Sequence, residues 1–285
     1  MEHKTAIVTG AYGGIGAACA ADLIERGHDV VIAGRDRGKG EALARTLGAR
    51  AHPLALDLAS LASVHAFPAA LDALELPPVR ALVLNAATMS LSRAPTATAD
   101  GIEANFGVNH LGHFALTLHL LAVLADPARI VVVSSSGHDP TTMAGRSGPP
   151  AWPGAEALAS PVSPNASQMA PMSRYTTSKL CNVLFAYELD RRLAAAGRRV
   201  AVNAFDPGVV LGTTLGRELS AFNRFLLSQP WLLRVAGARV VTSADAGRHL
   251  ASLAADPAFE GMRGKYFEGT REVKSSADSY DLDRA

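Results

Sequence analysis

Hydrophobic and polar positions divide this chain into short apolar runs separated by longer amphipathic stretches. The apolar runs, each of which predicts a buried strand, lie near 5–9, 29–33, 51–55, 81–84, 129–133, 200–204 and 264–267. Helical patterns fill the stretches between them. Strands that alternate with helices form a parallel sheet covered on both faces, because each crossover lays a helix against the sheet. The pattern therefore predicts an α/β fold with a doubly wound parallel sheet.

Two long segments interrupt this alternation. Residues 138–173 are rich in proline, and residues 209–241 carry many aromatic and leucine residues, notably between Phe222 and Leu233. Both follow strand ends at the edge where open α/β sheets bind ligands, and long insertions are often functional. We interpret both as walls of a substrate pocket. The alternatives are a disordered loop for the first and ordinary helix-packing surface for the second.

The length and composition agree with one globular domain. The 285 residues suit one large α/β domain, or two small ones on length alone, and no segment repeats. We therefore treat residues 1–285 as a single domain. Hydrophobic residues make up 48% and charged residues 19%, as in an ordinary core-forming chain. A formal charge of +1 gives no reason to expect nucleic acid or an anionic membrane as a partner.

The sequence also carries signals of location. Cys19 and Cys181 both lie inside helical patterns, which is typical of reduced, buried thiols. The first strand begins almost at the N-terminus, so we expect no signal peptide, and no apolar run is long enough to span a bilayer. We expect a soluble, cytoplasmic protein.

The first strand leads directly into a glycine-rich turn, Gly10-Ala-Tyr-Gly-Gly-Ile-Gly16. A helical stretch from Ala17 to about Arg26 and a second apolar strand follow. A strand, glycine turn, helix and strand in this order are the context in which such glycines bind a dinucleotide. The glycines let the backbone approach the pyrophosphate, and the helix N-terminus supplies N–H groups. This unit predicts a Rossmann-like fold.

Tyr175 and Lys179 stand four residues apart at the start of a helical pattern. Residues at this spacing share one face of a helix. A nearby ammonium favours the phenolate, so we expect the pKa of Tyr175 to fall toward working pH. A phenol with such a pKa can exchange a proton with a substrate oxygen.

Seven short motifs in order make the chain resemble the short-chain dehydrogenase/reductase family over nearly its whole length. They are Thr9-Gly10 with Gly14 and Gly16, Asp57-Leu58, Leu84-Asn85-Ala86-Ala87, Asn109, Ser134-Ser135, Tyr175 with Lys179, and Pro207-Gly208. Within the family it looks closest to retinol-dehydrogenase-like enzymes and to light-dependent protochlorophyllide reductases. Cys181 also matches the photoenzyme pattern, but Val209 stands where that pattern has a second cysteine, which favours the first branch.

The resemblance implies a set of catalytic roles. Tyr175 is the proton donor and acceptor, and Lys179 lowers its pKa while holding the nicotinamide ribose. Ser135, the second of three serines, hydrogen-bonds the substrate oxygen, and Asn109 holds a water that links Lys179 to solvent. We expect no metal, because His110 and His113 lack accompanying carboxylates or thiols.

The resemblance also implies the cofactor-binding residues. They are Gly10, Tyr12, Gly13, Gly14, Ile15, Gly16, Arg35, Asp57, Leu58, Asn85, Ala86, Tyr175, Lys179, Pro207, Gly208, Val209 and Thr213. Asp57 is expected to bind the adenine amine. The family's threonine after Pro-Gly falls at Gly212, so Thr213 or Thr214 takes its place, and the sequence does not choose between them.

The end of the second strand favours NADP(H) over NAD(H). An acidic residue there binds the ribose 2′-hydroxyl of NAD, whereas an arginine accommodates the 2′-phosphate of NADP. Gly34 occupies the acidic position and Arg35 follows it. Asp36 is left with two alternatives, to pair with Arg35 or to cap the next helix.

The function predicted from these features is an NADPH-dependent oxidoreductase that interconverts a carbonyl and an alcohol on a bulky, largely apolar small molecule. One alternative is an epimerase or dehydratase, because Gly10, Gly13 and Gly16 also fit the spacing Gly-x-x-Gly-x-x-Gly. The other is a regulator that binds the dinucleotide without catalysis. The identity of the substrate, the physiological direction, and the choice between monomer and homo-oligomer stay open.

Overall fold

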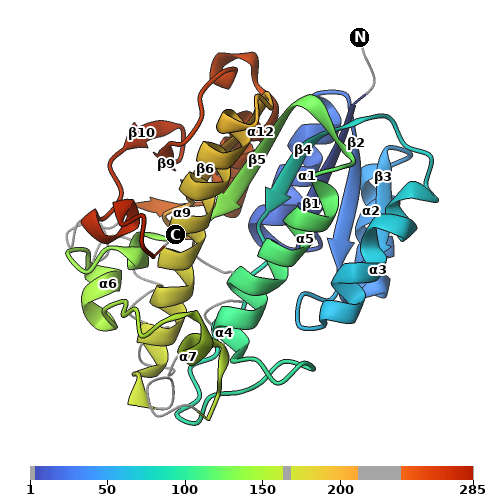
Figure 1. Cartoon of the computed structure of the whole chain (residues 1–285). Coiled ribbons are helices and arrows are strands. Elements are labelled where there is room, and N and C mark those ends of the chain that lie inside the picture. Colours follow the sequence, from blue (N-terminus) through green and yellow to red (C-terminus); the bar gives the residue numbers. More distant parts are fainter. Residues whose placement is uncertain (1–3, 163–167, 211–238, 285) are drawn as a thin grey trace.

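An eight-stranded sheet forms the centre of this computed structural model, which describes residues 4–162, 168–210 and 239–284 (Figure 1). The strands of this sheet are β1 (Lys4–Thr9), β2 (His28–Gly34), β3 (Ala51–Ala55), β4 (Val79–Leu84), β5 (Leu124–Val133), β6 (Val200–Asp206), β9 (Tyr266–Glu268) and β10 (Arg271–Val273). The longer helices are α1 (Gly14–Glu25), α2 (Arg37–Leu47), α3 (Leu61–Asp72), α5 (Gly112–Leu120), α9 (Pro171–Ala195) and α12 (Ser243–Ala255). The shorter elements are α4 (Ala104–Phe106), a π-helical turn (Gly107–Leu111), α6 (Met143–Ser147), α7 (Ala155–Ala159), and the pair β7 (Val209–Val210) and β8 (Val240–Val241).

The strand order is β10-β9-β6-β5-β4-β1-β2-β3. Neighbouring strands from β3 to β9 run parallel, and β10 runs antiparallel to β9. The predicted α/β, Rossmann-like, doubly wound fold in a single domain is confirmed. The prediction missed β10, because its three residues are short and largely exposed and so carry no apolar pattern.

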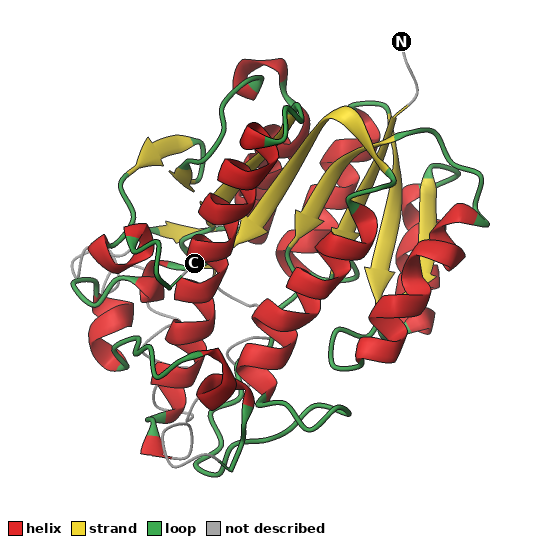
Figure 2. Cartoon of the chain, in the orientation of Figure 1, coloured by secondary structure: helices red, strands yellow, loops and turns green. Residues whose placement is uncertain are grey.

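Helices cover both faces of the sheet, and Figure 2 shows the strands between two helical layers. Side chains alternate along each strand, so that Ile7 packs with α3, α5 and α9 whereas Ala6 and Val8 pack with α1 and α12. The central strands β2, β4 and β5 repeat this alternation. Burial on both faces explains why these strands are continuous apolar runs in the sequence.

The order of strands reverses at β1, which lies between β2 and β4. The carboxyl ends of strands at such a switch point border the crevice where open α/β sheets bind ligands. The glycine turn follows β1 and the segment beginning at Asn85 follows β4, so both start at this crevice.

Residues 138–162 and 168–173 of the first predicted insertion are described, and they contain regular secondary structure. The insertion contains α6 and α7, and Leu158 of α7 packs in a small core with Phe106 and Cys181. Leu158 and its neighbours thus pack against the body of the domain, and the role of this insertion as a pocket wall stays a prediction. Of the second insertion, 209–210 and 239–241 are described, and the predicted segment from Phe222 to Leu233 lies outside the described residues.

Two further findings concern the sequence signals of location. Within 4–162, 168–210 and 239–284, none of the helices has both the length and the apolarity that a bilayer crossing requires. Cys19 and Cys181 are both free thiols buried inside helices, as predicted.

Candidate active site

The glycine turn is packed tightly on one side and open on the other. Gly10 and Gly14 have positive φ angles of +65° and +52°, where a side chain would be strained. A Cβ on Gly10 would lie 2.9 Å from the Cα of Ala86, and a Cβ on Gly16 would lie 2.6 Å from the Asn85 Nδ2. No atom lies within 4 Å of a Cβ placed on Gly13. The open side leaves room for a phosphate group to approach the backbone.

The N-terminus of α1 lacks the side-chain cap that α2, α3 and α12 have. Side chains of Asp36, Ser60 and Thr242 cap α2, α3 and α12 by accepting a backbone N–H. Gly13 offers no such cap to α1. The N–H groups of its first turn therefore keep their capacity for an anion, which the helix dipole also favours. The turn fits a pyrophosphate.

Thr9 holds the segment after β4 beside the glycine turn. Its hydroxyl oxygen accepts the backbone N–H groups of Asn85 (2.9 Å) and Ala86 (3.0 Å), and Asn85 Nδ2 donates to the Thr9 carbonyl (2.9 Å). The two segments that we predicted to contact the dinucleotide are thus fixed to each other at the switch point of the sheet.

His113 continues this network, a role that the sequence analysis missed. Its Nδ1 lies 3.1 Å from the Asn109 carbonyl, which can only accept, so Nδ1 carries the proton and Nε2 accepts from the Thr9 hydroxyl at 2.9 Å. Burial lowers the pKa of His113 to about 3, so the ring is neutral. His110 Nδ1 lies 3.3 Å from the Asn182 side-chain oxygen. A metal ligated by His113 would have to displace one of the two contacts of that ring.

The end of β2 has no room for an acidic side chain. A Cβ on Gly34 would lie 2.1 Å from Tyr12 Cε1, so the Tyr12 ring occupies that space. Asp36 caps α2 by accepting the Lys39 N–H at 3.0 Å and pairs with the Lys39 ammonium at 2.9 Å. Of the two alternatives for Asp36, capping is therefore the one observed. Arg35 is exposed beside these groups.

Asp57 and Leu58 lie at the same edge of the sheet. The residue before them, Leu56, donates its N–H to the Gly34 carbonyl at 3.0 Å. One Asp57 carboxylate oxygen accepts the Ala59 N–H at 2.9 Å, which fixes the side chain, and Leu58 is buried. This places both residues next to the end of β2, where the sequence predicts the adenosine.

Three serines, residues 134–136, follow β5, and the first two make different contacts with α9. Ser134 donates its hydroxyl to the Lys179 carbonyl at 2.7 Å, which is a structural contact. The Ser135 hydroxyl oxygen accepts the Gly137 N–H at 3.2 Å, and this hydroxyl lies close enough to the Tyr175 phenol to lower the pKa of that phenol. The structure thus brings together Ser135 and Tyr175, the pair that the family resemblance implied.

Lys179 is buried on the same helix as Tyr175. Its ammonium donates to the Val133 carbonyl at 3.2 Å and lies 5.7 Å from the centre of the Tyr175 ring. Burial lowers the pKa of Lys179 to about 8. Burial raises the pKa of Tyr175, and the charge of Asp206 adds to this, whereas the bond to Ser135 lowers it. The predicted fall in the Tyr175 pKa is wrong for this structure, because burial outweighs the favourable contacts.

Asn109 lies in the π-helical turn between α4 and α5, a geometry that often marks functional sites. Its side-chain amide donates to the Thr88 carbonyl (2.9 Å) and to Ser178 Oγ (3.0 Å), and its oxygen accepts the Thr88 N–H (2.7 Å). Ser178 donates in turn to the Tyr175 carbonyl at 2.7 Å. Asn109 therefore connects the segment after β4 to α9, the helix that carries Tyr175 and Lys179. Its water-holding role stays a prediction.

Asp206 is the second residue that the sequence analysis missed. It ends β6, is buried, and accepts the Gly208 N–H at 2.9 Å. Gly208 has a φ of +80°, and Arg239 donates to the Pro207 carbonyl at 3.0 Å. An aspartate before Pro-Gly looks like an ordinary turn residue, so its burial beside Tyr175 could not be predicted from the residues around it. Val209 begins β7, and Thr213 and Thr214 lie outside the described residues.

A cavity of about 340 Å³ lies over α5 and α9. Its lining residues are His110, Phe114, Leu118, Trp152, Cys181, Leu184, Phe185, Glu188, Leu189, Arg192 and Arg284. None of the predicted catalytic or cofactor residues is among them. One lining residue, Trp152, belongs to the first insertion, which the sequence predicts as a wall of the substrate pocket.

A dinucleotide-type glycine turn and a Ser-Tyr-Lys set at one edge of a doubly wound sheet define an NAD(P)-dependent oxidoreductase. The chain belongs to the short-chain dehydrogenase family, whose model matches residues 4–145. A mouse polyprenol dehydrogenase is 38% identical over 98% of this chain and 79% of its own length. A mouse retinol dehydrogenase 14 is 38% identical over 95% of this chain and 79% of its own length.

Solved structures show the same fold. An uncharacterised protein from Mycobacterium paratuberculosis superposes with a TM-score of 0.69 and 30% identity, over 98% of this chain and 88% of the other. A blue fluorescent protein from a metagenomic library, solved in complex with NADPH, superposes with a TM-score of 0.68 and 24% identity, over 93% of this chain and 95% of the other. The resemblance to retinol-dehydrogenase-like enzymes that the motifs indicated is confirmed by the two mouse relatives.

Proposed function

We propose that this protein is an NADPH-dependent oxidoreductase that interconverts a carbonyl and an alcohol on a bulky, largely apolar substrate. The observation that carries the proposal is the placement of the Lys179 ammonium 5.7 Å from the centre of the Tyr175 ring on α9, with Ser135 close enough to lower the pKa of the same phenol. A proton donor, a polarising hydroxyl and a cation are the groups that carbonyl reduction requires.

Each residue has a distinct role in this chemistry. When bound, the nicotinamide supplies a hydride to the carbonyl carbon or accepts one from the alcohol. In reduction, Tyr175 donates its proton to the carbonyl oxygen, and Ser135 donates a hydrogen bond to the same oxygen. Lys179 holds the nicotinamide ribose and, with a water at Asn109, returns a proton to Tyr175. In oxidation, the same proton path runs in reverse.

The preference for NADPH is supported by the end of β2. The Tyr12 ring excludes a carboxylate at Gly34, so no acidic group there would repel a 2′-phosphate. Arg35 is exposed, and the Lys39 ammonium lies 5.9 Å from the centre of the Tyr12 ring. These cations offer charge-assisted bonds to a phosphate.

The substrate class is supported by the apolar composition of the second insertion and by the relatives. Two of these are named for dehydrogenation of polyprenol and retinol, which are long apolar alcohols. We therefore propose an apolar, isoprenoid-like alcohol or its aldehyde or ketone as the substrate.

Consumption of NADPH and NADH with a panel of apolar aldehydes and ketones, including retinal and a polyprenal, tests the proposal. We expect turnover with NADPH to exceed turnover with NADH. Dinucleotide binding without turnover of any carbonyl or alcohol would instead favour the regulator. NAD that stays bound through purification, with no net consumption, would favour the epimerase or dehydratase.

A further inference from the structure

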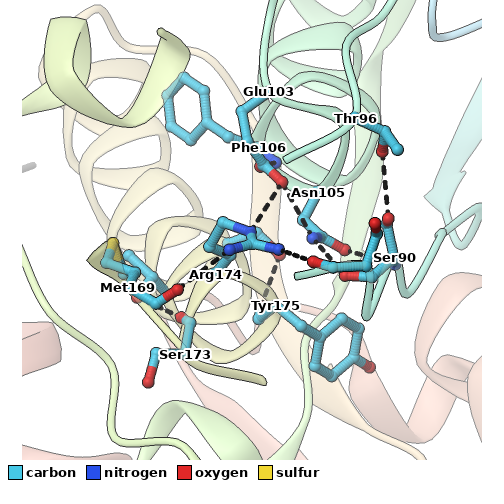
Figure 3. A network of polar contacts seen from close by, with 12 residues as sticks. Ser90, Thr96, Glu103, Asn105, Phe106, Met169, Ser173, Arg174 and Tyr175 are labelled. Atoms are coloured by element: carbon cyan, nitrogen blue, oxygen red, sulfur yellow. Dashed lines mark hydrogen bonds and ion pairs between the residues drawn. The ribbon is translucent and has the colours of Figure 1, made fainter. Parts of the chain in front are cut away.

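Arg174, which immediately precedes Tyr175, is buried to 2% exposure near the start of α9 (Figure 3). A guanidinium is always charged in proteins, so its burial requires partners. The mechanism proposed above does not use this residue, and neither the glycine turn nor the catalytic set contacts its guanidinium.

The guanidinium of Arg174 joins three separate segments. One nitrogen donates to the Met169 carbonyl at 3.0 Å, in the last part of the first insertion. A second donates to the Ser92 carbonyl, in the segment that follows β4. The third, Nε, lies 3.4 Å from a carboxylate oxygen of Glu103, which is itself buried and precedes α4.

Glu103 extends the connection. One carboxylate oxygen accepts the Phe106 N–H at 2.8 Å and so caps α4, and the other accepts from Asn105 Nδ2 at 3.0 Å. Asn105 also accepts the Ser90 N–H at 2.9 Å and donates to the Ser90 carbonyl at 3.0 Å. Figure 3 shows this network running from Met169 through Arg174 and Glu103 to Ser90 and Thr96.

The segment after β4 is therefore fixed to the catalytic helix at two places. Asn109 and Ser178 hold Thr88, and Arg174, Glu103 and Asn105 hold residues 90–92. The same segment begins at Asn85 and Ala86, the predicted cofactor residues. Because Tyr175 is the next residue along the backbone, a shift of Arg174 moves the phenol relative to this segment.

We propose that Arg174 is a positioning residue that sets the place of Tyr175 against the segment 85–92, with Glu103 as its charge partner. This inference rests on the proposed function, in which Tyr175 transfers the proton. A planar guanidinium can reach two carbonyls and a carboxylate in different directions, whereas a lysine ammonium is a single point of charge. Proton transfer is sensitive to such placement, since a displacement of about 1 Å can reduce a rate about a hundredfold.

Arg174→Lys tests the proposal, because it keeps the charge and loses the fork of donors. We expect kcat to fall about ten- to a hundredfold, while KM for the carbonyl and Kd for NADPH stay nearly unchanged. The solvent deuterium isotope effect on kcat should increase, because a misplaced phenol makes proton transfer limit the rate. Arg191→Lys is the matched control, since Arg191 lies exposed on the same helix and pairs with Glu188 at 2.6 Å.

Glu103→Gln provides a second variant that keeps the shape of the partner. It should produce the same kind of change in kcat and isotope effect, to a smaller extent. A folded Arg174→Lys enzyme with wild-type kcat and isotope effect would overturn the proposal. If Arg174→Lys does not fold, wild-type values in Glu103→Gln would overturn it.

Hydrogen exchange separates this inference from the proposed function. Amides of residues 88–92 and 172–176 should exchange faster in Arg174→Lys than in the wild-type protein, while those of β1 and β4 stay protected. If the wild-type protein reduces no carbonyl, the proposed function fails, and the exchange comparison still decides whether Arg174 holds both segments. Unchanged exchange in both segments would contradict the proposal.

Discussion

The glycine turn and the start of α9 build the two halves of the site in opposite ways. The turn is defined by side chains that are missing, since a Cβ on Gly10 or Gly16 would meet the segment after β4. The first part of α9 is defined by polar side chains that are present and buried, including Arg174, Thr176 and Lys179. The turn thus depends on the positive φ of Gly10 and on the close approach of the segment after β4, whereas the helix depends on hydrogen-bond partners for its buried polar side chains.

Substitutions in the two halves of the site should therefore have different effects. A larger side chain in the turn would collide with atoms of the segment after β4, so we expect such a substitution to change dinucleotide affinity and the free energy of unfolding. A change in α9 removes one member of a hydrogen-bonded set, so we expect its effect on the rate of the chemical step.

Tyr175→Phe tests this contrast with the largest expected effect. The ring should still pack, so folding and NADPH binding should survive. Turnover should fall at least 10²–10⁴-fold, since that is about the contribution of general acid catalysis. Steady-state rates and a fluorescence titration of NADPH measure the two quantities. Tyr187→Phe is the matched control on the same helix, because the Tyr187 hydroxyl bonds Ser275 at 2.7 Å and should leave kcat unchanged. Near-normal carbonyl reduction by Tyr175→Phe would refute the mechanism.

Arg35→Ala should change affinity without changing the chemical step. Loss of a charge-assisted bond to the 2′-phosphate should cost about 1.5–3 kcal/mol of NADPH binding and leave NADH nearly unaffected. Titration of both cofactors checks this, with Arg45→Ala as a control for the loss of an exposed arginine in α2. Equal weakening of NADPH and NADH would show that Arg35 does not recognise the phosphate.

Gly16→Ala should affect the turn more than Gly13→Ala. The new Cβ at Gly16 would lie 2.6 Å from both Asn85 Nδ2 and the Gly10 carbonyl oxygen, so we expect a loss of about 1–3 kcal/mol in the free energy of unfolding. At Gly13 the backbone is extended, with a φ of −168°, and no atom lies within 4 Å of the new Cβ. The free energy of unfolding of Gly13→Ala should therefore stay close to the wild-type value. Urea denaturation of both variants measures the difference, and equal losses would contradict the packing described for the turn.

Asp206→Asn should produce the smallest effect, a shift in pH dependence. The Asp206 carboxylate raises the pKa of Tyr175, so its replacement should lower that pKa. The limb of the pH–rate profile that reports Tyr175 should therefore move to lower pH. Asparagine keeps an oxygen to accept the Gly208 N–H. Glu268 and Arg239 also act on Asp206, so Glu268→Gln serves as a control for a more distant charge. A shift toward higher pH would contradict the assigned sign.

Much of the site could be predicted because its signals are local. The glycines of the turn follow an apolar strand, and Tyr175 and Lys179 share a helix face by their spacing. The preference for NADP(H) was likewise predicted from two adjacent residues, Gly34 and Arg35, at the end of one strand. These features depend on backbone geometry and helical periodicity, which neighbouring residues determine.

The alternation of strands and helices, the glycine turn and the order of the family motifs are all recognisable in the amino-acid sequence. Which buried polar groups meet became apparent only in the folded chain. His113 with Thr9, Asp206 beside Tyr175, and Arg174 with Glu103 join residues that are far apart in the chain. Burial also reversed the expected shift in the Tyr175 pKa, because desolvation depends on everything packed around the phenol. The spacing of apolar residues indicates which face of a helix or strand is buried. The partner of a buried polar group depends instead on how distant segments pack together.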